Sequence, residues 1–439
     1  MTTILVRETN TMQTSQGSAT PLRRLRRAVP GLSLLGAVLA FAACSNVLDV
    51  QFPGRIPVEQ LDSPTLAPVL ADGVVGDLEC AYNNYFSGSS AQSDEFEASN
   101  DNGTLANAGE RNVTAENDDY VISGCEASSG SFGIQTTMHT ARFQSEDVYN
   151  RLALWNDTQV AGRVGLQAKV RAYGAYAYTF LGETYCTVSI DGSAPAAPAT
   201  ALALAALRFA DAITLANQAG TFPGKTDIIN MSNVGLARVN LDLKNWPAAA
   251  TFAALVPAGF ELFAGRGIEN DRRWNKMYYL FNQLGAFVVA NSYRNLNDPR
   301  VPIVDLHKGA FNPDIDLWVT TKYTSLGDPV RLASYREAQL ILAEAKAMQG
   351  DVGGAMTILN GRRGELGLTP LAAADQAAAV NQVIDERRKE LAFEGGHRLN
   401  DLLRKNIPWK VTGTKNPFTG RPYGITTCWP TPTKELNGH

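Results

Sequence analysis

The feature that most constrains the fold is a helical repeat of apolar residues in the middle of the chain. Between residues 160 and 185, apolar side chains recur at steps of three and four, at Leu166, Val170, Tyr173, Tyr176 and Phe180. This spacing places them on one face of an α-helix. Similar patterns cover residues 64–82, 136–155, 199–219, 232–243 and 246–255. We therefore expect a mainly α fold.

The last quarter of the chain predicts a tight helical hairpin followed by a third helix. Helical patterns at 330–349 and 352–363 flank Gly350 and Asp351. Glycine suits the left-handed position that ends a helix, and aspartate is a good N-cap for the next one. A third pattern, at 373–404, is broken near its paired glycines. Hairpins of this kind are typical of tetratricopeptide-like helix pairs.

Helical periodicity disappears in two stretches, residues 83–135 and 256–329. The first is rich in Asn, Asp, Ser and Gly, and the second mixes Gly, Pro and aromatic residues with strand-like runs at 286–289 and 317–321. We interpret both as loop-rich, with little β-structure. The sequence thus predicts a single domain at 44–439, with a helical scaffold at about 60–82, 136–255 and 330–405 and an irregular lobe.

The N-terminus has the pattern of an exported, lipid-anchored protein. Several arginines precede an apolar run at 28–43 that ends at Cys44, and the run is too short to span a bilayer. Small residues before this cysteine resemble the bacterial lipobox, although Phe41 departs from it. We expect residues 1–43 to be a signal peptide and Cys44 to carry lipid. An ordinary signal peptide with an incidental cysteine is the alternative, and Met12 could be the true start.

The charge balance argues against a nucleic-acid partner. The formal net charge is −4 and 45% of the residues are hydrophobic. Outside the N-terminal arginines there is no long basic run to match a phosphate backbone. The composition instead predicts a large core.

Four cysteines follow Cys44, none of them in a CxxC pair. Export to an oxidising compartment favours two disulfides, and three pairings are open. We favour Cys80 with Cys125, which closes a polar segment, and Cys186 with Cys428, which ties down the C-terminal tail. Unpaired buried cysteines are the alternative.

The sequence predicts no metal centre and no organic cofactor. Its four histidines form no HxH or HExxH motif, so a zinc site has no support. The Asp- and Asn-rich stretch at 94–102 offers oxygen ligands for Ca²⁺ but lacks the order of an EF-hand loop. Calcium stays open as the one metal to consider.

A dense charged cluster near the C-terminus predicts ion pairs between helices. Three of its glutamates are spaced four residues apart on one helical face, whereas glycosidase carboxyls face each other across a cleft. We expect a structural network in which Arg388 and Arg398 pair with Glu344 or Glu337 of the preceding hairpin. The members are Glu386, Arg387, Arg388, Glu390, Glu394, Arg398, Asp401 and Arg404.

Several ordered blocks resemble the SusD/RagB family of nutrient-binding lipoproteins. They are "LDV" at 48–50, "VRAYGAYAYTFLGETYC" at 170–186, "DPRVPIVD" at 298–305, "KY" at 322–323, "RLASYREAQLILAEAKAMQGDVGGAMTILNGRRGELG" at 331–367, "IDERRKELAFEGGHRLNDLLR" at 384–404 and "CWPTPTKELN" at 428–437. His397 between the glycines and Arg398 is a departure from the family pattern.

The resemblance implies a tetratricopeptide-like protein held at the cell surface of the outer membrane. Such proteins are non-catalytic and act as a lid on a SusC-like TonB-dependent transporter, to which they deliver oligosaccharides or, in some members, peptides. Two alternatives from other classes remain, a surface glycoside hydrolase and a structural or scaffolding lipoprotein without ligand.

Sugar binding requires flat apolar side chains beside planar hydrogen-bonding groups. Two aromatic clusters have this composition, one at 82–86 and one between 274 and 294, although core packing is an alternative for each aromatic residue. The ligand-binding candidates are Tyr82, Asn84, Tyr85, Trp274, Tyr278, Tyr293 and Arg294.

Overall fold

The structure is a computed structural model, which describes residues 60–436 except for 102, 117–119, 122 and 123. The predicted signal peptide and Cys44 lie outside the described residues. The proposed start at Met12 and the "LDV" block do so too.

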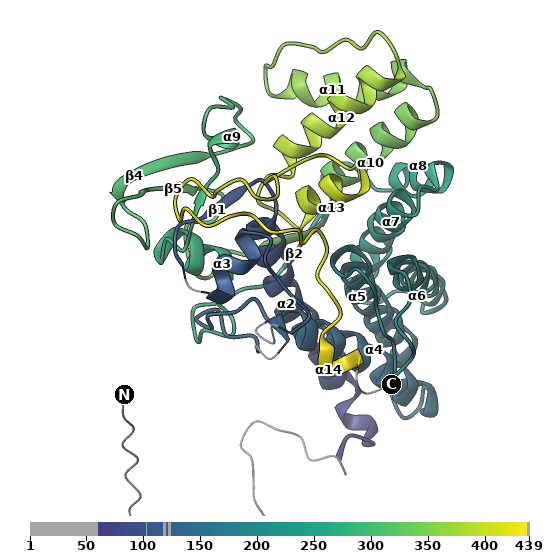
Figure 1. The fold of residues 1–439 in the computed structure, drawn as a ribbon. Coiled ribbons are helices and arrows are strands. Elements are labelled where there is room, and N and C mark those ends of the chain that lie inside the picture. The colour runs from purple at the N-terminus through teal and green to yellow at the C-terminus, as the bar shows by residue number, and fades with distance from the viewer. Residues whose placement is uncertain (1–59, 102, 117–119, 122–123, 437–439) are drawn as a thin grey trace, which may run out of the picture. The chain divides into compact units, whose positions relative to one another are not determined.

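The helical part is a succession of packed neighbours (Figure 1). Along the chain α4 packs on α2 and α5, α5 on α6, α6 on α7, α7 on α8, and α10 on α8, α11 and α12. The prediction of a mainly α fold with tetratricopeptide-like helix pairs is confirmed. The helices are α2 (Ala67–Gln92), α4 (Ile134–Leu154), α5 (Arg163–Thr184), α6 (Pro198–Gln218), α7 (Lys225–Asp242), α8 (Trp246–Ala254), α10 (Tyr335–Met348), α11 (Val352–Glu365), α12 (Gln376–Glu390) and α13 (His397–Arg404).

The irregular lobe holds short strands and helices beside α2 and α13 (Figure 1). Its strands pair only two by two and antiparallel, β1 with β3 and β4 with β5, while β2 pairs with β6 beside the helices. Long loops fill the rest. The elements of the lobe are β1 (Phe96–Ala98), α3 (Gly103–Gly109), the π-helix η4 (Tyr278–Gln283), β3 (Phe287–Val289), α9 (Asn291–Arg294), β4 (Ile303–Gly309) and β5 (Asp316–Thr320). The remaining short elements are β2 (Glu261–Ala264), β6 (Val330–Ser334), the 3₁₀ helix η2 (Pro64–Leu66) before α2, and α14 (Thr433–Leu436) near the C-terminus.

The hairpin between α10 and α11 forms as the sequence predicts. Gly350 has a positive φ of 85°, and the Asp351 side chain accepts a hydrogen bond of 2.8 Å from the backbone N–H of Gly354. Glycine reverses the chain and aspartate caps the new helix.

The prediction of a loop from residue 83 onward is wrong for its first ten residues. The helix α2 continues to Gln92, and every residue from 83 to 92 is buried. A helix that is buried all round has no apolar stripe, so the periodicity that signals a surface helix is missing. Small polar residues fill the segment because their side chains hydrogen-bond to neighbouring segments, as Asn83 does to the Trp274 carbonyl.

The first predicted helix of the C-terminal hairpin also begins later than expected. Residues 330–334 form β6, which pairs with β2, and Ser334 caps α10 by accepting a hydrogen bond from the Glu337 N–H. The third predicted helix divides into α12 and α13. The chain between them turns through Phe393, Gly395 and Gly396, all at positive φ.

Among the described residues, α6 is the one helix long and apolar enough to cross a membrane. It buries Ala205, Phe209 and Ala212 between α5 and α7, as a core helix does. Length and composition are weak evidence for a span here.

Both favoured disulfides are present. Cys80 is bonded to Cys125 and Cys186 to Cys428, with Cα–Cα distances of 5.2 and 5.1 Å. The first joins α2 to the loop before α4, and the second joins the end of α5 to the C-terminal segment.

Candidate functional site

The first aromatic cluster lies inside the protein. Tyr82 and Tyr85 stack on Phe180 with ring centroids 5.1 and 4.4 Å apart, and neither tyrosine is more than 1% exposed. Their hydroxyls donate to the Arg331 carbonyl and to Glu183. Burial raises the pKa of both phenols. Because both rings are buried, they are not accessible to a ligand in this conformation. The two tyrosines are part of the core.

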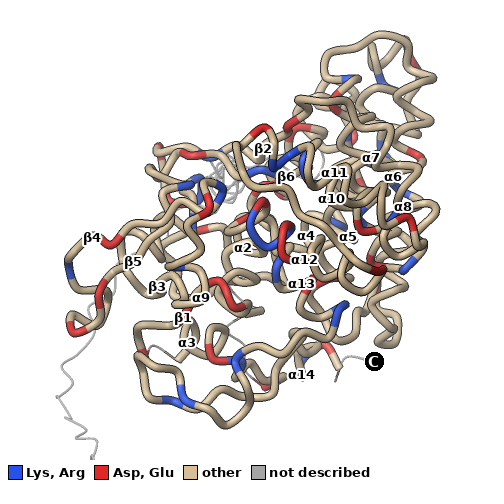
Figure 2. Tube along the Cα trace, turned by 90° about the horizontal axis from the view of Figure 1, so that it is seen from above, with Lys and Arg blue, Asp and Glu red and all other residues tan. Residues whose placement is uncertain are grey.

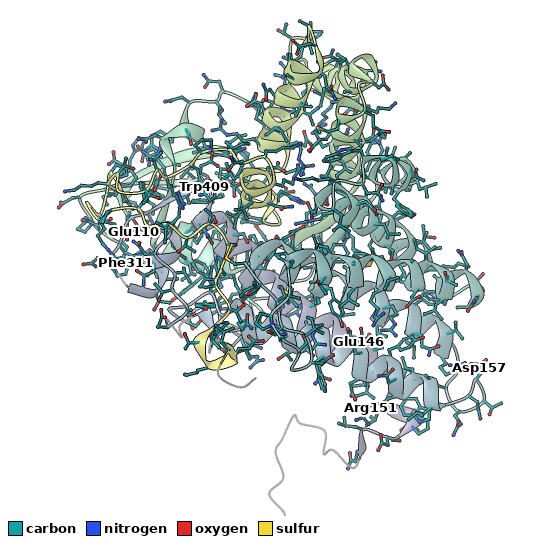
Figure 3. All side chains as sticks on the ribbon, turned by 45° about the vertical axis from the view of Figure 1, so that its right-hand side comes forward. Glu110, Glu146, Arg151, Asp157, Phe311 and Trp409 are labelled. Carbon is teal, nitrogen blue, oxygen red and sulfur yellow. A yellow bond between two sulfur atoms is a disulfide. The ribbon has the colours of Figure 1, made fainter. Side chains whose placement is uncertain are left out.

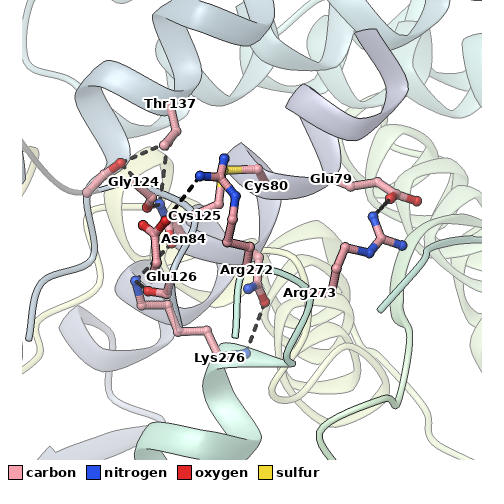
Figure 4. The surroundings of a disulfide bond; sticks show 12 residues. Glu79, Cys80, Asn84, Gly124, Cys125, Glu126, Thr137, Arg272, Arg273 and Lys276 are labelled. Carbon is pink, nitrogen blue, oxygen red and sulfur yellow. Dashed lines mark hydrogen bonds and ion pairs between the residues drawn. A yellow bond between two sulfur atoms is a disulfide. The ribbon is translucent and has the colours of Figure 1, made fainter. Parts of the chain in front are cut away.

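Asn84 is also buried, and it helps to bind a lysine beneath the second cluster. Its Oδ1 accepts from Lys276 Nζ at 2.9 Å, and its Nδ2 donates to the Gly124 carbonyl at 3.1 Å. Lys276 also donates to the Ser131 carbonyl at 2.7 Å. Figure 4 shows this group beside the disulfide formed by Cys80 and Cys125. These contacts fix the start of η4 against α2.

Above this support, Trp274 and Tyr279 form a partly exposed aromatic pair. Their ring centroids are 5.5 Å apart and the rings are tilted by 39°. The indole N–H of Trp274 donates to the Ile268 carbonyl at 3.3 Å. Tyr278 is likewise partly exposed, and it begins η4. π-Helical turns of this kind are frequent at functional sites.

Tyr293 and Arg294 end α9, but their side chains have different surroundings. Tyr293 is 1% exposed, packs on Phe393 and lies under the guanidinium of Arg388. Arg294 is half-buried between two aromatic rings, with its Cζ 5.1 Å from the Trp318 centroid and 5.5 Å from that of Phe418. We call Arg294, Trp318 and Phe418 the lobe aromatic site.

The lobe aromatic site is positioned by backbone contacts. Arg294 Nε donates to the Val289 carbonyl at 2.7 Å, while its Nη2 finds no hydrogen-bond partner among the described residues. Burial lowers the pKa of this guanidinium, and the carboxylates of Asp305 and Asp316 act in the opposite direction. Flat rings beside a guanidinium and two nearby carboxylates are the chemistry that a polyhydroxylated ligand requires.

Sequence reasoning missed Trp318 and Phe418. The run at 317–321 does predict a strand, and β5 alternates so that Leu317 and Val319 are buried while Trp318 is partly exposed. That alternation is the signal that could have found the tryptophan. Phe418 lies in an irregular loop, where the Asn416 side chain accepts from its N–H at 2.8 Å, so no periodicity marks it.

Further aromatic side chains are exposed on the same lobe. Figure 3 labels Phe311 and Trp409 there, and Phe311 is 51% exposed. Trp409 stacks under Arg111, with the guanidinium 4.6 Å from the ring centroid. The lobe therefore presents several flat apolar surfaces to solvent.

The C-terminal charges form the expected ion-pair network, which passes through the interior. Glu386 pairs with Arg300 and Arg363, and Glu390 with Arg362, at 2.6–2.9 Å. Figure 2 shows the opposite charges interleaved near β6 and α12. A carboxylate held by arginines is a poor general acid, because the paired cation favours its ionised form.

The predicted partners of two arginines are wrong. Arg398 binds both oxygens of Asp94, at 2.7 and 2.6 Å, and Arg388 donates to the Ser292 carbonyl. Glu344 instead pairs with Arg404 at 2.5 Å. Arg398 follows the turn between α12 and α13, which changes the face that it presents. Arg388 precedes that turn and lies on the side of α12 that meets α9.

The stretch considered for calcium is engaged in protein contacts. Asp94 binds Arg398, and Glu95 accepts from the Phe393 N–H at 2.6 Å. Asn100 donates to the Ala286 carbonyl. Within the described part of the chain, no group of three or more His, Cys, Asp or Glu side chains could hold a metal ion.

This architecture is similar to that of known proteins. Residues 328–424 match the model of the SusD family. This C-terminal segment is similar to the SusD/RagB family, and solved SusD-like structures share the fold of the chain. A SusD superfamily protein from Parabacteroides distasonis has a TM-score of 0.62 at 13% identity, over 87% of this chain and 98% of that one. No curated protein matches the sequence.

Two other solved structures carry a ligand class in their names. A SusD-like carbohydrate binding protein from Bacteroides vulgatus has a TM-score of 0.57 at 17% identity, over 80% of this chain and 86% of that one. Surface glycan-binding protein A from Bacteroides uniformis has a TM-score of 0.58 at 14% identity, over 83% and 97%. At these identities the SusD-like fold is what is shared.

Proposed function

We propose that this protein is a non-catalytic surface lipoprotein that captures oligosaccharides. The observation that carries the proposal is the SusD-like fold, which is shared over 80% and 83% of this chain with structures named for carbohydrate and glycan binding. The lobe aromatic site supports it, because sugar C–H faces pack on aromatic rings and hydroxyls bind planar polar groups. Peptides are the second ligand class.

Binding through the lobe aromatic site is tested by titrating the full-length protein with neutral hexa-oligosaccharides in a calorimeter. We expect Trp318→Ala to weaken the binding of the best ligand by about threefold to tenfold, the equivalent of about 0.7–1.4 kcal/mol for one aromatic contact. Phe263→Ala, which removes a 41% exposed ring on β2, is the matched control.

Equal affinities of the wild type and Trp318→Ala would remove the lobe aromatic site from the proposal. Trp274→Ala then tests the aromatic pair with Tyr279 in the same assay. Release of new reducing ends during the titration would favour a glycoside hydrolase. An absence of binding to every glycan and peptide tested would favour a scaffolding lipoprotein.

We further propose that the protein delivers its ligand to a SusC-like TonB-dependent transporter in the outer membrane, where lipid on Cys44 anchors it. The support is the match of residues 328–424 to the SusD family model, together with the lipobox-like sequence before Cys44. Co-purification of the tagged full-length chain with a SusC-like transporter from membranes tests the partnership. Cys44→Ser is expected to move the protein from the membrane fraction to the soluble fraction, and unchanged fractionation would contradict the anchor.

A further inference from the structure

A second concave surface lies on α4 where α14 approaches it, and it shares no residue with the lobe aromatic site. The two helices are neighbours in Figure 1, and the Gln135 side chain donates to Glu435 between them. The depression is shallow and open to solvent, with a volume of about 500 Å³. We call its main residues the α4 face, which consists of Gln135, His139, Thr140, Arg142, Phe143 and Gln144.

An aromatic ring stands at the centre of the α4 face. Phe143 is 54% exposed, although α4 buries its opposite side, including Met138 and Ala141, in the core. His139 and Thr140 precede Phe143 by four and three residues, so they lie beside it on the helix surface. An exposed phenyl ring bordered by hydrogen-bonding groups offers a stacking surface for the C–H face of a sugar.

Three of the polar groups beside Phe143 are uncharged donors or acceptors. Thr140 contributes a hydroxyl and Gln144 an amide. Burial and the nearby charge of Arg142 lower the pKa of His139 to about 4. The imidazole is therefore neutral at physiological pH, with one donating and one accepting nitrogen.

Two nearly buried side chains in the wall of this depression carry unsatisfied hydrogen-bonding atoms. Gln135 is 7% exposed and Arg142 is 5% exposed. Gln135 Oε1 has no hydrogen-bond donor among the described residues, and the Arg142 guanidinium lies over the Tyr178 ring with its Nε and Nη1 lacking a well-aligned acceptor. Each such atom costs about 1–3 kcal/mol while it has no partner. These atoms are buried, so the more accessible polar groups of the α4 face are Thr140 and Gln144.

The charged groups of this wall already have hydrogen-bond partners. Arg142 Nη2 pairs with Asp191 at 2.7 Å, and the Glu435 carboxylate accepts from Gln135. A phosphate or carboxylate ligand would compete with Asp191 and Glu435, whereas a neutral polyol would not. We propose that the α4 face is a second carbohydrate site, which stacks a neutral sugar ring on Phe143 and binds its hydroxyls through Thr140 and Gln144. The glycan class of this ligand rests on the proposed function.

The test is affinity electrophoresis of the full-length protein in native gels that contain starch, xylan, galactomannan, laminarin or dextran. In the gel that retards the wild type most, we expect Phe143→Ala to raise the apparent Kd by about threefold to tenfold. Phe143→Tyr is expected to retain binding. Leu154→Ala removes an 81% exposed side chain at the end of the same helix and should change nothing.

The outcomes separate the two proposals. Retardation of Phe143→Ala equal to that of the wild type overturns the second site and leaves the proposed function in place. Loss of retardation in Phe143→Ala, with Trp318→Ala unaffected, supports the α4 face and moves capture away from the lobe aromatic site. Passage of the wild type through all five gels without retardation overturns both. Should Phe143→Ala lower the thermal midpoint, Gln144→Ala provides the same test.

Discussion

At the scale of single residues, a buried charge connects α5, α7 and the turn before α13. Arg238 on α7 is 2% exposed and binds Glu183 on α5 through two contacts of 2.6 and 2.7 Å. The same guanidinium donates to the Gly395 carbonyl at 2.8 Å, in the turn before α13. Burying such charges costs several kcal/mol, and only good hydrogen-bond geometry offsets that cost.

We expect Arg238→Met to lower the free energy of unfolding by about 3–5 kcal/mol, because Glu183 and Glu337 are left buried without their cation. Urea denaturation measures the change. The control is Arg163→Met, whose partner Asp157 is largely exposed, and it should cost less than about 1 kcal/mol. Similar losses in both variants would contradict the buried-charge explanation.

A second prediction concerns pH and Lys276. Burial lowers the pKa of this lysine from 10.5 to about 7, with Glu126 and Asp271 acting in the opposite direction. Between pH 7 and 10.5 the unfolded chain therefore binds more protons at this site than the folded chain, so the contribution to stability rises with pH. The slope cannot exceed about 1.4 kcal/mol per pH unit.

Lys276→Met should remove that slope. Glu95 and Glu337, whose pKa burial raises to about 7, give the opposite trend at lower pH, because the folded chain there holds the extra protons. The measurement is therefore the free energy of unfolding from pH 8 to 10, in the wild type and the variant. Parallel curves over this range would show that Lys276 is not the group that titrates.

At the scale of elements, small residues set the distance between helices. Gly235 on α7 faces Phe209 on α6, and a Cβ added at Gly235 would lie 2.2 Å from the phenyl ring. By contrast, a Cβ added to Gly361 on α11 would meet nothing within 4 Å. The two glycines therefore serve different purposes, although both lie inside helices.

We expect Gly235→Ala to destabilise the protein by about 1–3 kcal/mol, because the ring and the helix must move to accept the methyl group. Gly361→Ala should stabilise it by about 0.5–1 kcal/mol through helix propensity alone. Thermal denaturation of the two variants beside the wild type gives opposite shifts in Tm. Shifts of the same sign would contradict the close approach of α6 and α7.

At the scale of the whole molecule, the C-terminal segment crosses back to the helices. Trp429 is buried, its N–H donates to the Thr184 carbonyl at 2.8 Å, and its carbonyl accepts from Cys186 at 2.9 Å. The disulfide to Cys428 fixes the same crossing over a separation of 242 residues. The end of the chain thus joins the scaffold to the lobe.

We expect loss of the Cys186–Cys428 disulfide to cost more stability than loss of the other one. The loop-entropy model gives about 4 kcal/mol for a separation of 45 residues and about 1.5 kcal/mol more for 242. Denaturation of the two double alanine variants tests the order. A larger loss on removal of Cys80 and Cys125 would show that local contacts, such as those of Lys276, outweigh chain entropy.

The sequence by itself determined the positions of the helices that bury one face, and the residues that end one helix and begin the next. The repeat at 160–185 fixes α5, and Gly350 with Asp351 fixes the hairpin of α10 and α11, because local geometry suffices in both cases. It also favoured the two disulfides that form. Where a helix is buried all round, as α2 is beyond residue 82, the local signal fails.

Only the tertiary structure decided which aromatic residues face solvent. Tyr82, Tyr85 and Tyr293 are in the core, while Trp318 and Phe418, 100 residues apart in the chain, come together around Arg294. Composition describes what a side chain can do, but its exposure depends on distant segments that pack against it. For the same reason helical spacing did not predict the partners of Arg398, which follows the turn between α12 and α13, or of Arg388, which meets α9.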